Sequence, residues 1–224
     1  MDKYDWLKKH PVIHFNEIVR KIGNRNYAKI FVHRLIKAGK LRTIGKGAYS
    51  ASDNIFAIAS NVHFPSYLSF LSASYLYGFT QAIPVRAYVV TEKKHKTAKI
   101  MDYEIEFVAS RHVWGYHKEK QGEEDIFLAD IEKLMIDAFL KPEHMGNFNE
   151  MENIFVQSSE PSLEKLKEYM LRLDSGRIYR QVGYMLEKHK GIDIHGWMKF
   201  DKNYYSLNPF QRGRKIDKKW RLRV

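Results

Sequence analysis

The sequence predicts an α+β fold, and three observations support this class. Apolar residues recur with helical spacing in several segments, as with Phe15, Ile18, Val19 and Ile22. Other segments are rich in β-branched residues or alternate apolar with polar side chains, as residues 103–108 do. Of the 224 residues, 44% are hydrophobic and 14% aromatic, which is enough to build a buried core. We therefore expect one large or two small folded domains.

Positive charge is concentrated at the two ends of the chain. The sequence holds 38 Lys and Arg against 26 Asp and Glu, a formal net charge of +12. Residues 1–52 carry +9 and residues 201–224 carry +6, whereas residues 53–200 carry −3. A compact segment of high positive charge attracts polyanions, so nucleic acid is the first partner to consider and an anionic membrane surface a weaker second.

The first 52 residues contain the patterns of three helices. Residues 3–9 predict a short helix that ends before Pro11, because proline disfavours helical geometry in the residue preceding it. A second helix is predicted over residues 15–22 and ends at Gly23, which tolerates left-handed geometry. A third helix, over residues 25–38, has an apolar face and a mainly basic opposite face. That apolar face consists of Ala28, Phe31, Val32 and Leu35.

A glycine-rich turn follows the third helix. Residues 41–44 and 48–50 are prone to form strands, and they flank Gly45-Lys46-Gly47, which predicts a β-hairpin. Helix, helix, tight turn, helix and hairpin is the order of a winged helix-turn-helix. We therefore predict that residues 1–52 form a DNA-binding domain of this type. Protein-docking modules use the same elements, and that alternative stays open.

In a winged helix-turn-helix the third helix enters the major groove and the hairpin, or wing, lies along the backbone or minor groove. Arg25 and Asn26 stand at the start of that helix, where arginine suits guanine and asparagine suits adenine. On the wing, Arg42 and Lys46 are expected to contact phosphates. With the residues further along the helix, the predicted DNA-binding set is Arg25, Asn26, Lys29, His33, Lys37, Arg42 and Lys46.

Near residue 52 the composition changes from basic to apolar and aromatic, which places a domain boundary there. Residues 53–224 are predicted to form a second, mixed α/β domain. Residues 55–59 begin a helix that ends before Pro65. Residues 65–78 predict the next helix, which is so densely apolar that we expect it to be the central helix of the core.

Strands and further helices follow in this second part. Residues 87–91 and 103–108 predict strands, and residues 220–224 predict a last strand. Three more helices are predicted, one capped by Asp130, one over residues 162–173 and one over residues 177–188. On the first of these three, we expect the charged side chains to form a solvated face, with a partner-binding face as the alternative. They are Asp130, Glu132, Lys133 and Asp137.

No common enzyme motif is present. The sequence lacks a P-loop, a dinucleotide fingerprint, a zinc-protease helix motif and a nucleophile elbow. Asp102, Glu104 and Glu106 on one predicted strand could gather a divalent cation for a nuclease, although solvent-facing acids have the same pattern. His112 and His117 fit surface positions better than metal ligands. We therefore expect no catalytic site, no metal and no cofactor, with a metal-dependent nuclease as an alternative.

The absence of cysteine indicates a reducing compartment, with the cytoplasm as the default. The N-terminus has no signal-peptide pattern, and no apolar run approaches the ~20 residues needed to span a bilayer. We expect neither export nor membrane insertion.

Five groups of residues, in order along nearly the whole chain, resemble the AbiEi-type antitoxins of type IV toxin–antitoxin systems. The first is residues 45–49 at the wing, and the second joins residues 65–73 to residues 77–80. The third joins residues 129–133 to Asp137-Ala138. The remaining two are residues 180–187, and residues 207–209 with residues 220–222. The family often has proline where Ile131 stands and aspartate where Asn208 stands.

This resemblance implies a winged-helix domain that represses its own operon by binding operator DNA. It also implies a C-terminal antitoxin domain that counters a nucleotidyltransferase-like toxin without a stable complex with it. Charge and element order predict the DNA-binding half independently, whereas the antitoxin half follows from the resemblance alone. A ligand-sensing winged-helix regulator, with a pocket in residues 53–224, is a further alternative.

Overall fold

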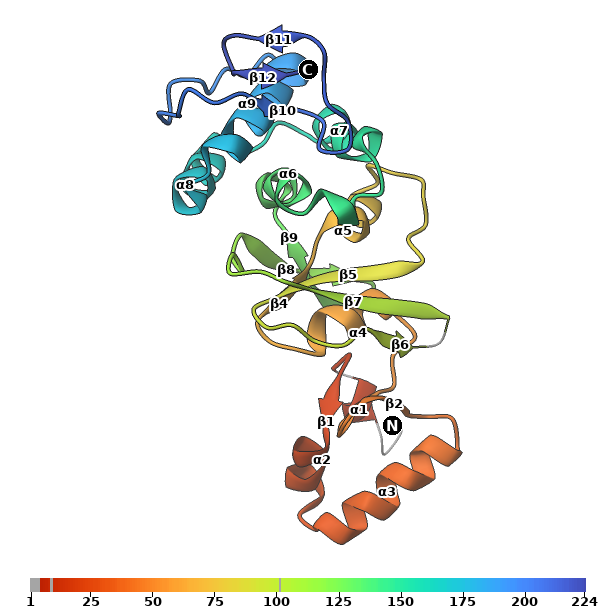
Figure 1. The fold of residues 1–224 in the computed structure, drawn as a ribbon. Coiled ribbons are helices and arrows are strands. Elements are labelled where there is room, and N and C mark those ends of the chain that lie inside the picture. Colours follow the sequence, from red (N-terminus) through yellow and green to blue (C-terminus); the bar gives the residue numbers. More distant parts are fainter. Residues whose placement is uncertain (1–4, 9, 101) are drawn as a thin grey trace. The chain divides into compact units, whose positions relative to one another are not determined.

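The computed structural model describes residues 5–8, 10–100 and 102–224, and it confirms the predicted α+β class (Figure 1). Contacts within the chain define two compact units. Unit 1 comprises residues 1–68, 85–113 and 117–128, and unit 2 comprises residues 69–84, 114–116 and 129–224. Residue 52 falls inside unit 1, where the Ser52 hydroxyl donates a hydrogen bond to the Glu124 carboxylate at 2.8 Å. The division of the chain by function at this residue stays a prediction.

Unit 1 begins with a small helical cluster and a three-stranded sheet. The helices are α1 (Asp5–Lys8), α2 (Phe15–Ile22) and α3 (Arg25–Lys37). The strands are β1 (Ile13–His14), β2 (Arg42–Gly45) and β3 (Ala48–Ser50), in the antiparallel order β1-β3-β2. The structure confirms the helix predicted at residues 15–22, the helix that begins at residue 25, and the hairpin. Of the first predicted helix, Lys3, Tyr4 and Lys9 lie outside the described residues. Strand β1 was not predicted, because two residues carry no periodicity. The core of this part consists of Leu7, Ile13, Ile18, Ala28, Val32, Leu35 and Leu41.

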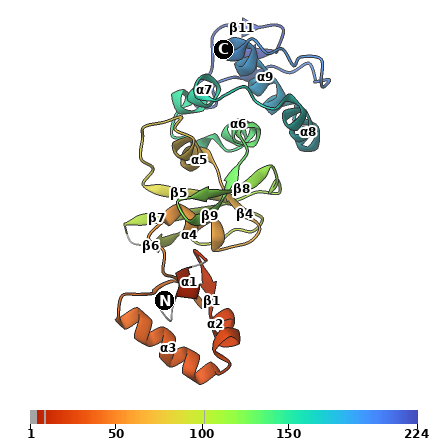
Figure 2. The ribbon, with the colours of Figure 1, turned by 180° about the vertical axis from the view of Figure 1, so that it is seen from behind.

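The rest of unit 1 is built on a six-stranded mixed sheet. Its strands are β4 (Ser66–Leu68), β5 (Arg86–Thr91), β6 (Ala98–Ile100), β7 (Tyr103–Ala109), β8 (Tyr116–Gln121) and β9 (Glu124–Ala129). Their spatial order is β6-β7-β5-β4-β9-β8. Helix α4 (Ile55–Asn61) contacts β4 and β5 and lies against one face of the sheet in both views (Figures 1 and 2). The strands predicted at residues 87–91 and 103–108 are confirmed.

The predicted helix over residues 65–78 is wrong in its first half. Ser66 to Leu68 form β4, which pairs antiparallel with β5 on one side and parallel with β9 on the other. The helix α5 spans only Phe70–Leu76. All three residues of β4 are buried, and a strand buried on both faces shows no alternation of polar and apolar side chains. A short apolar run of this kind looks the same as one turn of a buried helix.

Unit 2 is organised around α6 (Ile131–Leu140), not around the predicted helix at residues 65–78. Helix α6 contacts α5, α7 (Phe148–Gln157), α8 (Leu163–Leu173) and α9 (Gly176–Lys190). A short 3-10 helix, η1 (Pro142–His144), follows it. The helices predicted to begin near residues 130, 162 and 177 are confirmed, whereas α7 was not predicted.

The C-terminal residues of unit 2 form a small three-stranded sheet. Strand β12 (Leu222–Arg223) lies between β10 (Tyr205–Ser206), which is parallel to it, and β11 (Ile216–Asp217), which is antiparallel. The strand predicted over residues 220–224 is shorter in the structure and covers only Leu222–Arg223, with Trp220 in the turn before it. Trp220 and Leu222 are both buried. Among the helices of the described ranges, none combines the length and apolar character needed to cross a membrane.

The expected solvated face of α6 is wrong, because its charged side chains are buried. The relative exposure of Asp130, Glu132, Lys133 and Asp137 is 6%, 6%, 0% and 1%. The Lys133 ammonium donates to the Asp137 carboxylate, which also accepts a hydrogen bond from the Ser69 hydroxyl at 2.8 Å. Burial lowers the pKa of Lys133. Partners inside the core compensate for the desolvation of these charges, and the sequence gives no sign of those partners.

The two acids at the start of α6 bind other elements of unit 2. The Asp130 carboxylate accepts a hydrogen bond from the Tyr169 hydroxyl at 2.7 Å and forms an ion pair with Lys165 at 3.2 Å. It stands at the N-cap position, but its side chain forms no capping hydrogen bond, which corrects the predicted role. The Glu132 carboxylate accepts from the backbone N–H of Ser162 at 2.6 Å. Both acids therefore connect α6 to α8.

Candidate nucleic-acid interface

A tight turn between α2 and α3 sets the position of α3. Gly23 ends α2 with φ of 81°, a left-handed conformation that glycine adopts without steric cost. The Asn24 side chain then caps α3 by accepting a hydrogen bond from the N–H of Tyr27 at 2.9 Å. Ala28, Val32 and Leu35 anchor the helix in the core. The opposite face of α3 is thereby fixed toward solvent.

The solvent-facing side of α3 carries the predicted helical residues. Arg25, Asn26, Lys29, His33 and Lys37 are all exposed. At about 100° per residue, Asn26, His33 and Lys37 lie along one line opposite the buried face, with Lys29 beside it. Arg25 lies at the start of the helix, where its guanidinium is 5.3 Å from the Phe15 ring centroid. The structure therefore brings these five predicted residues onto one surface.

The hairpin lies beside this surface. Its tip is tied to the start of α2, because the Phe15 N–H donates to the Gly47 carbonyl at 2.8 Å. Gly47 has φ of +70°, so the turn favours glycine there. Lys46 is exposed at the tip. Arg42 differs from the other predicted residues, because its guanidinium donates to the Asp53 carboxylate and, at 2.8 Å, to the Ser52 carbonyl.

A groove of about 370 Å³ separates α3 from the hairpin. Lys29 and His33 line it from the helix, while Phe15, Val32 and Tyr49 give it an apolar floor. Two of the predicted DNA-binding residues therefore border the groove between α3 and the hairpin. The remaining lining residues are Ile36 and Gly47.

The region of α3 and the hairpin contains no acid of its own, and Asp53, which follows it directly, pairs with Arg42. Residues 18–52 contain nine Lys and Arg and no Asp or Glu. The nearest preceding acid, Glu17, is engaged in accepting a hydrogen bond from the backbone N–H of His14 at 2.7 Å. A run of cations without acids produces a positive potential over the whole surface of α3 and the hairpin.

Sequence reasoning missed three residues on the same surface. Tyr27 and Ile30 have relative exposures of 49% and 50%, and Arg34 is also exposed. Ile30 follows Asn26 by four positions, so it lies on the same line of the helix. That spacing could have identified it, but an apolar residue on a basic face does not fit a search for cations. Ile30 is suited to contact a thymine methyl group.

The acidic cluster considered for a nuclease has another partner. The Arg86 guanidinium donates to Glu104 at 2.7 Å and to Glu106 at 3.2 Å. These contacts raise the pKa of Arg86, chiefly through the hydrogen bond to Glu104. Asp102 is exposed. Throughout the ranges that the structure describes, no three His, Asp or Glu side chains gather in a way that could hold a metal ion.

The two histidines considered as metal ligands each contact another residue. His117 is on β8 and its Nε2 is 3.4 Å from the Glu119 carboxylate. The backbone N–H of His112 donates to the Ser110 hydroxyl at 3.0 Å. Neither contact involves the other histidine.

No family model and no curated protein matches this chain.

Proposed function

We propose that this chain represses its own operon by binding operator DNA through α3 and the β2–β3 hairpin, and that it is the antitoxin of a type IV toxin–antitoxin system. The observation that carries the DNA-binding half is the exposed basic face of α3 beside the hairpin, within residues 18–52 that contain no acid. The protein acts in the cytoplasm, without catalysis and without a cofactor.

In this proposal α3 enters the major groove. Asn26 and Arg25 read adenine and guanine edges, and Ile30 contacts a thymine methyl group. Lys29, His33 and Lys37 follow along the helix, and Lys46 at the hairpin tip contacts a phosphate. Neutralising each phosphate contributes about −0.9 to the slope of log affinity against log salt.

Arg42 can bind a phosphate in this proposal only after it leaves its present partners. Its guanidinium is held by the Asp53 carboxylate and the Ser52 carbonyl. It reaches a phosphate only if the phosphate replaces Asp53 as its anionic partner. We therefore expect Arg42 to contribute less to DNA binding than Lys46.

The antitoxin half rests on the resemblance, and four of the segments that carry it contact one another within unit 2. Ser69 donates to Asp137, and the Trp220 indole N–H donates to Glu187 at 2.6 Å. These two pairs join four of the segments that resemble AbiEi-type antitoxins. We propose that this part counters a nucleotidyltransferase-like toxin without a stable complex.

The two halves are separable by variants on α3. The double variant K29E/K37E and the single variant Asn26→Ala are expected to lose repression of a reporter driven by the operon's promoter. Neutralisation of the cognate toxin on co-expression is expected to stay at the level of the parent protein. K202E/K215E makes the same change in charge at exposed positions of unit 2 and is the matched control. Loss of repression in the control as well would contradict a specific role for α3.

A second candidate is protein docking through the same face, because Tyr27, Ile30 and Ile36 are apolar and exposed. A docking surface would retain its partner when Lys29 and Lys37 are replaced, since apolar contacts do not depend on charge. The reporter assay separates the two, because docking alone gives no repression.

A further inference from the structure

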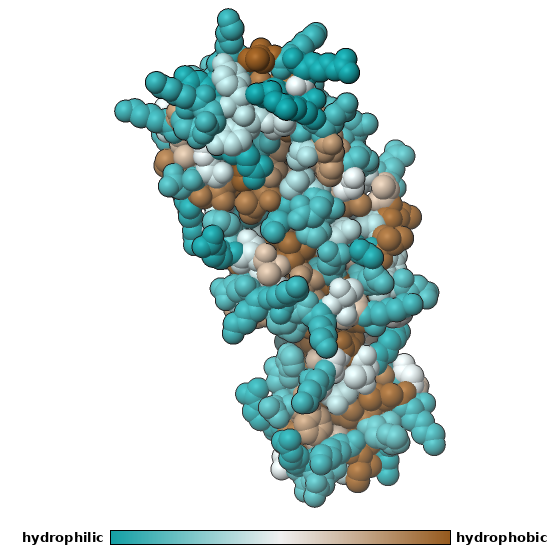
Figure 3. All heavy atoms as spheres, viewed as in Figure 1, coloured by the Kyte–Doolittle hydropathy of each residue, from teal (hydrophilic) through white to brown (hydrophobic). Residues whose placement is uncertain are grey.

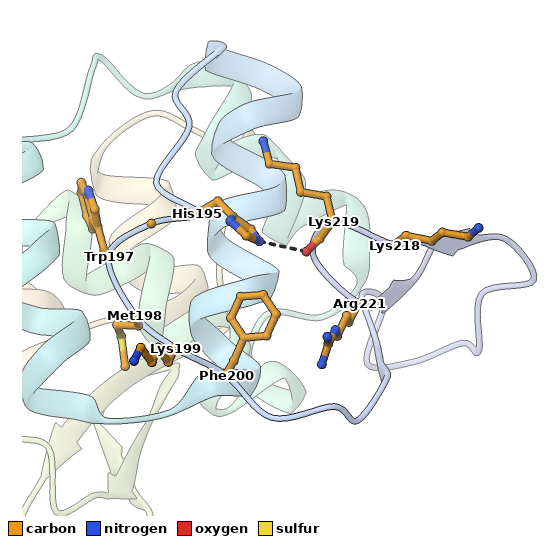
Figure 4. A pocket seen from close by; sticks show the side chains of 9 residues that line it. His195, Trp197, Met198, Lys199, Phe200, Lys218, Lys219 and Arg221 are labelled. Atoms are coloured by element: carbon orange, nitrogen blue, oxygen red, sulfur yellow. Dashed lines mark hydrogen bonds between the residues drawn. The ribbon is translucent and has the colours of Figure 1, made fainter.

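A hollow of about 810 Å³ in unit 2 lies between the loop that follows α9 and the chain that leads into β12 (Figure 4). Sites for small molecules have volumes of roughly 300–1,000 Å³, so this hollow is large enough for a nucleotide. Hydrophilic side chains gather over the C-terminal part of the surface (Figure 3). Residues 201–224 supply a net charge of +6.

The lining of the hollow is cationic and contains no carboxylate. Lys199, Lys218, Lys219 and Arg221 belong to it. Lys199 and Lys218 are exposed, and in the described part of the chain neither has a hydrogen-bond or ion-pair partner. Figure 4 shows Lys218 extending away from the centre, while Lys199 lies beside Met198 on one side of Phe200 and Arg221 lies on the other side. Lys199 and Arg221 therefore flank the Phe200 side chain.

The other two cations are partly engaged. Lys219 pairs with Glu187 at 2.6 Å and with Asp193 at 2.8 Å, and these contacts raise the pKa of Lys219. Arg221 donates from one terminal nitrogen to the Asp201 carbonyl at 2.8 Å, and among the residues that the structure describes no carboxylate forms an ion pair with it. Glu187 and Asp193 already neutralise Lys219, so Arg221 is better suited than Lys219 to bind an anionic ligand.

Aromatic side chains stand beside these cations. Phe200 and Trp197 line the hollow and are half-buried. The Arg221 guanidinium lies 5.9 Å from the centroid of the Phe200 ring, and the His195 ring meets Phe200 edge-on at 5.4 Å. His195 Nε2 lies 3.1 Å from the Lys219 carbonyl and, because a carbonyl oxygen only accepts, this nitrogen is the donor.

We infer that this hollow binds a nucleotide, with its base against Phe200 or Trp197 and its phosphate groups reaching Lys199 and Arg221 on the two sides of Phe200. Aromatic faces with adjacent cations recognise a base and its phosphate together, as they do in sites for single-stranded nucleic acid. The nucleotide is either free or part of a single strand, and the two sources share this chemistry. This site is separate from α3 and does not depend on the proposed repression of an operon.

The test uses the full chain at low salt. ATP, inorganic triphosphate and a single-stranded RNA of about six nucleotides are each titrated, with calorimetry for the small molecules and anisotropy for labelled RNA. ATP or the RNA is expected to bind at least about tenfold more tightly than triphosphate, the change that one stacked base gives. Lys199→Glu and Phe200→Leu are each expected to weaken that binding by about tenfold or more.

Two controls locate the binding. Lys202→Glu alters an exposed lysine close in sequence but outside the hollow and is expected to leave the affinity unchanged. K29E/K37E alters the α3 surface and is expected to leave ATP binding unchanged, so failure of this site and failure of the α3 proposal are distinguishable. Circular dichroism confirms that each variant folds, and Lys199→Glu gives the decisive result if Phe200→Leu does not.

The results distinguish a free nucleotide from a single strand, and both from an inference that is wrong. Binding of ATP indicates a free nucleotide, and binding of RNA without ATP indicates a single strand, with either result supporting the site. Equal affinity for ATP and triphosphate would show that the aromatic side chains contribute nothing and would overturn the inference. Binding unaffected by Lys199→Glu, or binding by neither ATP nor RNA, would overturn it as well.

Discussion

Gly183 lies in the middle of α9, and replacing it by alanine tests the packing of unit 2. The test is whether this substitution raises or lowers the free energy of unfolding. A Cβ atom placed there would lie 2.3 Å and 2.4 Å from two carbons of the Trp220 ring. Trp220 is buried, and its indole N–H is held by Glu187 at 2.6 Å. The ring therefore has little room to move away from an added methyl group.

The expected magnitude for Gly183→Ala comes from two opposing effects. Alanine in place of glycine within a helix is favourable by about 1 kcal/mol where nothing is in the way. Overpacking a filled core costs about 1–3 kcal/mol, and contacts this short place the cost at the upper end of that range. We therefore expect a net loss of about 2 kcal/mol in the free energy of unfolding.

Urea unfolding of the full chain, followed by circular dichroism and tryptophan fluorescence, measures this loss. Gly196→Ala is the control, because a Cβ atom at Gly196 meets nothing within 4 Å, and its effect is expected to stay within about 0.5 kcal/mol. In a Trp220→Leu background, Gly183→Ala is expected to cost less, which would show coupling between the two positions. A stabilising effect of Gly183→Ala in the parent protein would refute the packing of α9 against Trp220.

Three further expectations concern the core, the acid response and α3. Asp137→Ala leaves the Lys133 ammonium buried without its carboxylate and is expected to cost about 3–5 kcal/mol in urea unfolding, while a loss below about 1 kcal/mol would contradict the buried pair. The pKa of His63 is lowered from 6.5 by burial and by the neighbouring charge of His95, so the folded state binds fewer protons than the unfolded state. Stability is therefore expected to fall as the pH drops below 6.5, and thermal unfolding at a series of pH values should show a smaller fall for His63→Asn. Asn24→Ala removes the hydrogen bond to the Tyr27 N–H and is expected to cost about 1 kcal/mol, with no loss in thermal stability arguing against the cap.

Periodicity in the sequence identified elements that have one buried and one exposed face. Helix α2 fits its prediction because Ile18 is buried while Asn16 and Glu17 face solvent. Strand β4 was missed because Ser66, Tyr67 and Leu68 are all buried, which removes the alternation. Short elements and elements buried on every side are fixed by neighbours distant in the sequence, and a local pattern does not contain that information.

The buried charges of α6 show that local sequence patterns also fail to predict the surroundings of some side chains. Lys133 and Asp137, four residues apart, have the spacing of a solvent-exposed ion pair on a helix. Their burial depends on Ser69 and on the helices around α6, which no local pattern reveals. On α3, by contrast, charge and helical spacing placed the predicted residues on one exposed surface. The engagement of Arg42 by Asp53 and the exposure of Ile30 became visible only in the structure.

Binding to the operon's own promoter tests the central claim most directly. Fluorescence anisotropy compares a labelled promoter fragment with a scrambled duplex of equal length across a salt series, with the parent protein and with K29E/K37E. The account predicts a preference of about 10³-fold or more for the promoter. It also predicts a salt slope that becomes shallower, by about 0.9 for each phosphate that Lys29 or Lys37 contacts, when the two lysines are replaced. Equal affinity for both duplexes, or promoter binding that K29E/K37E leaves unchanged, would contradict it.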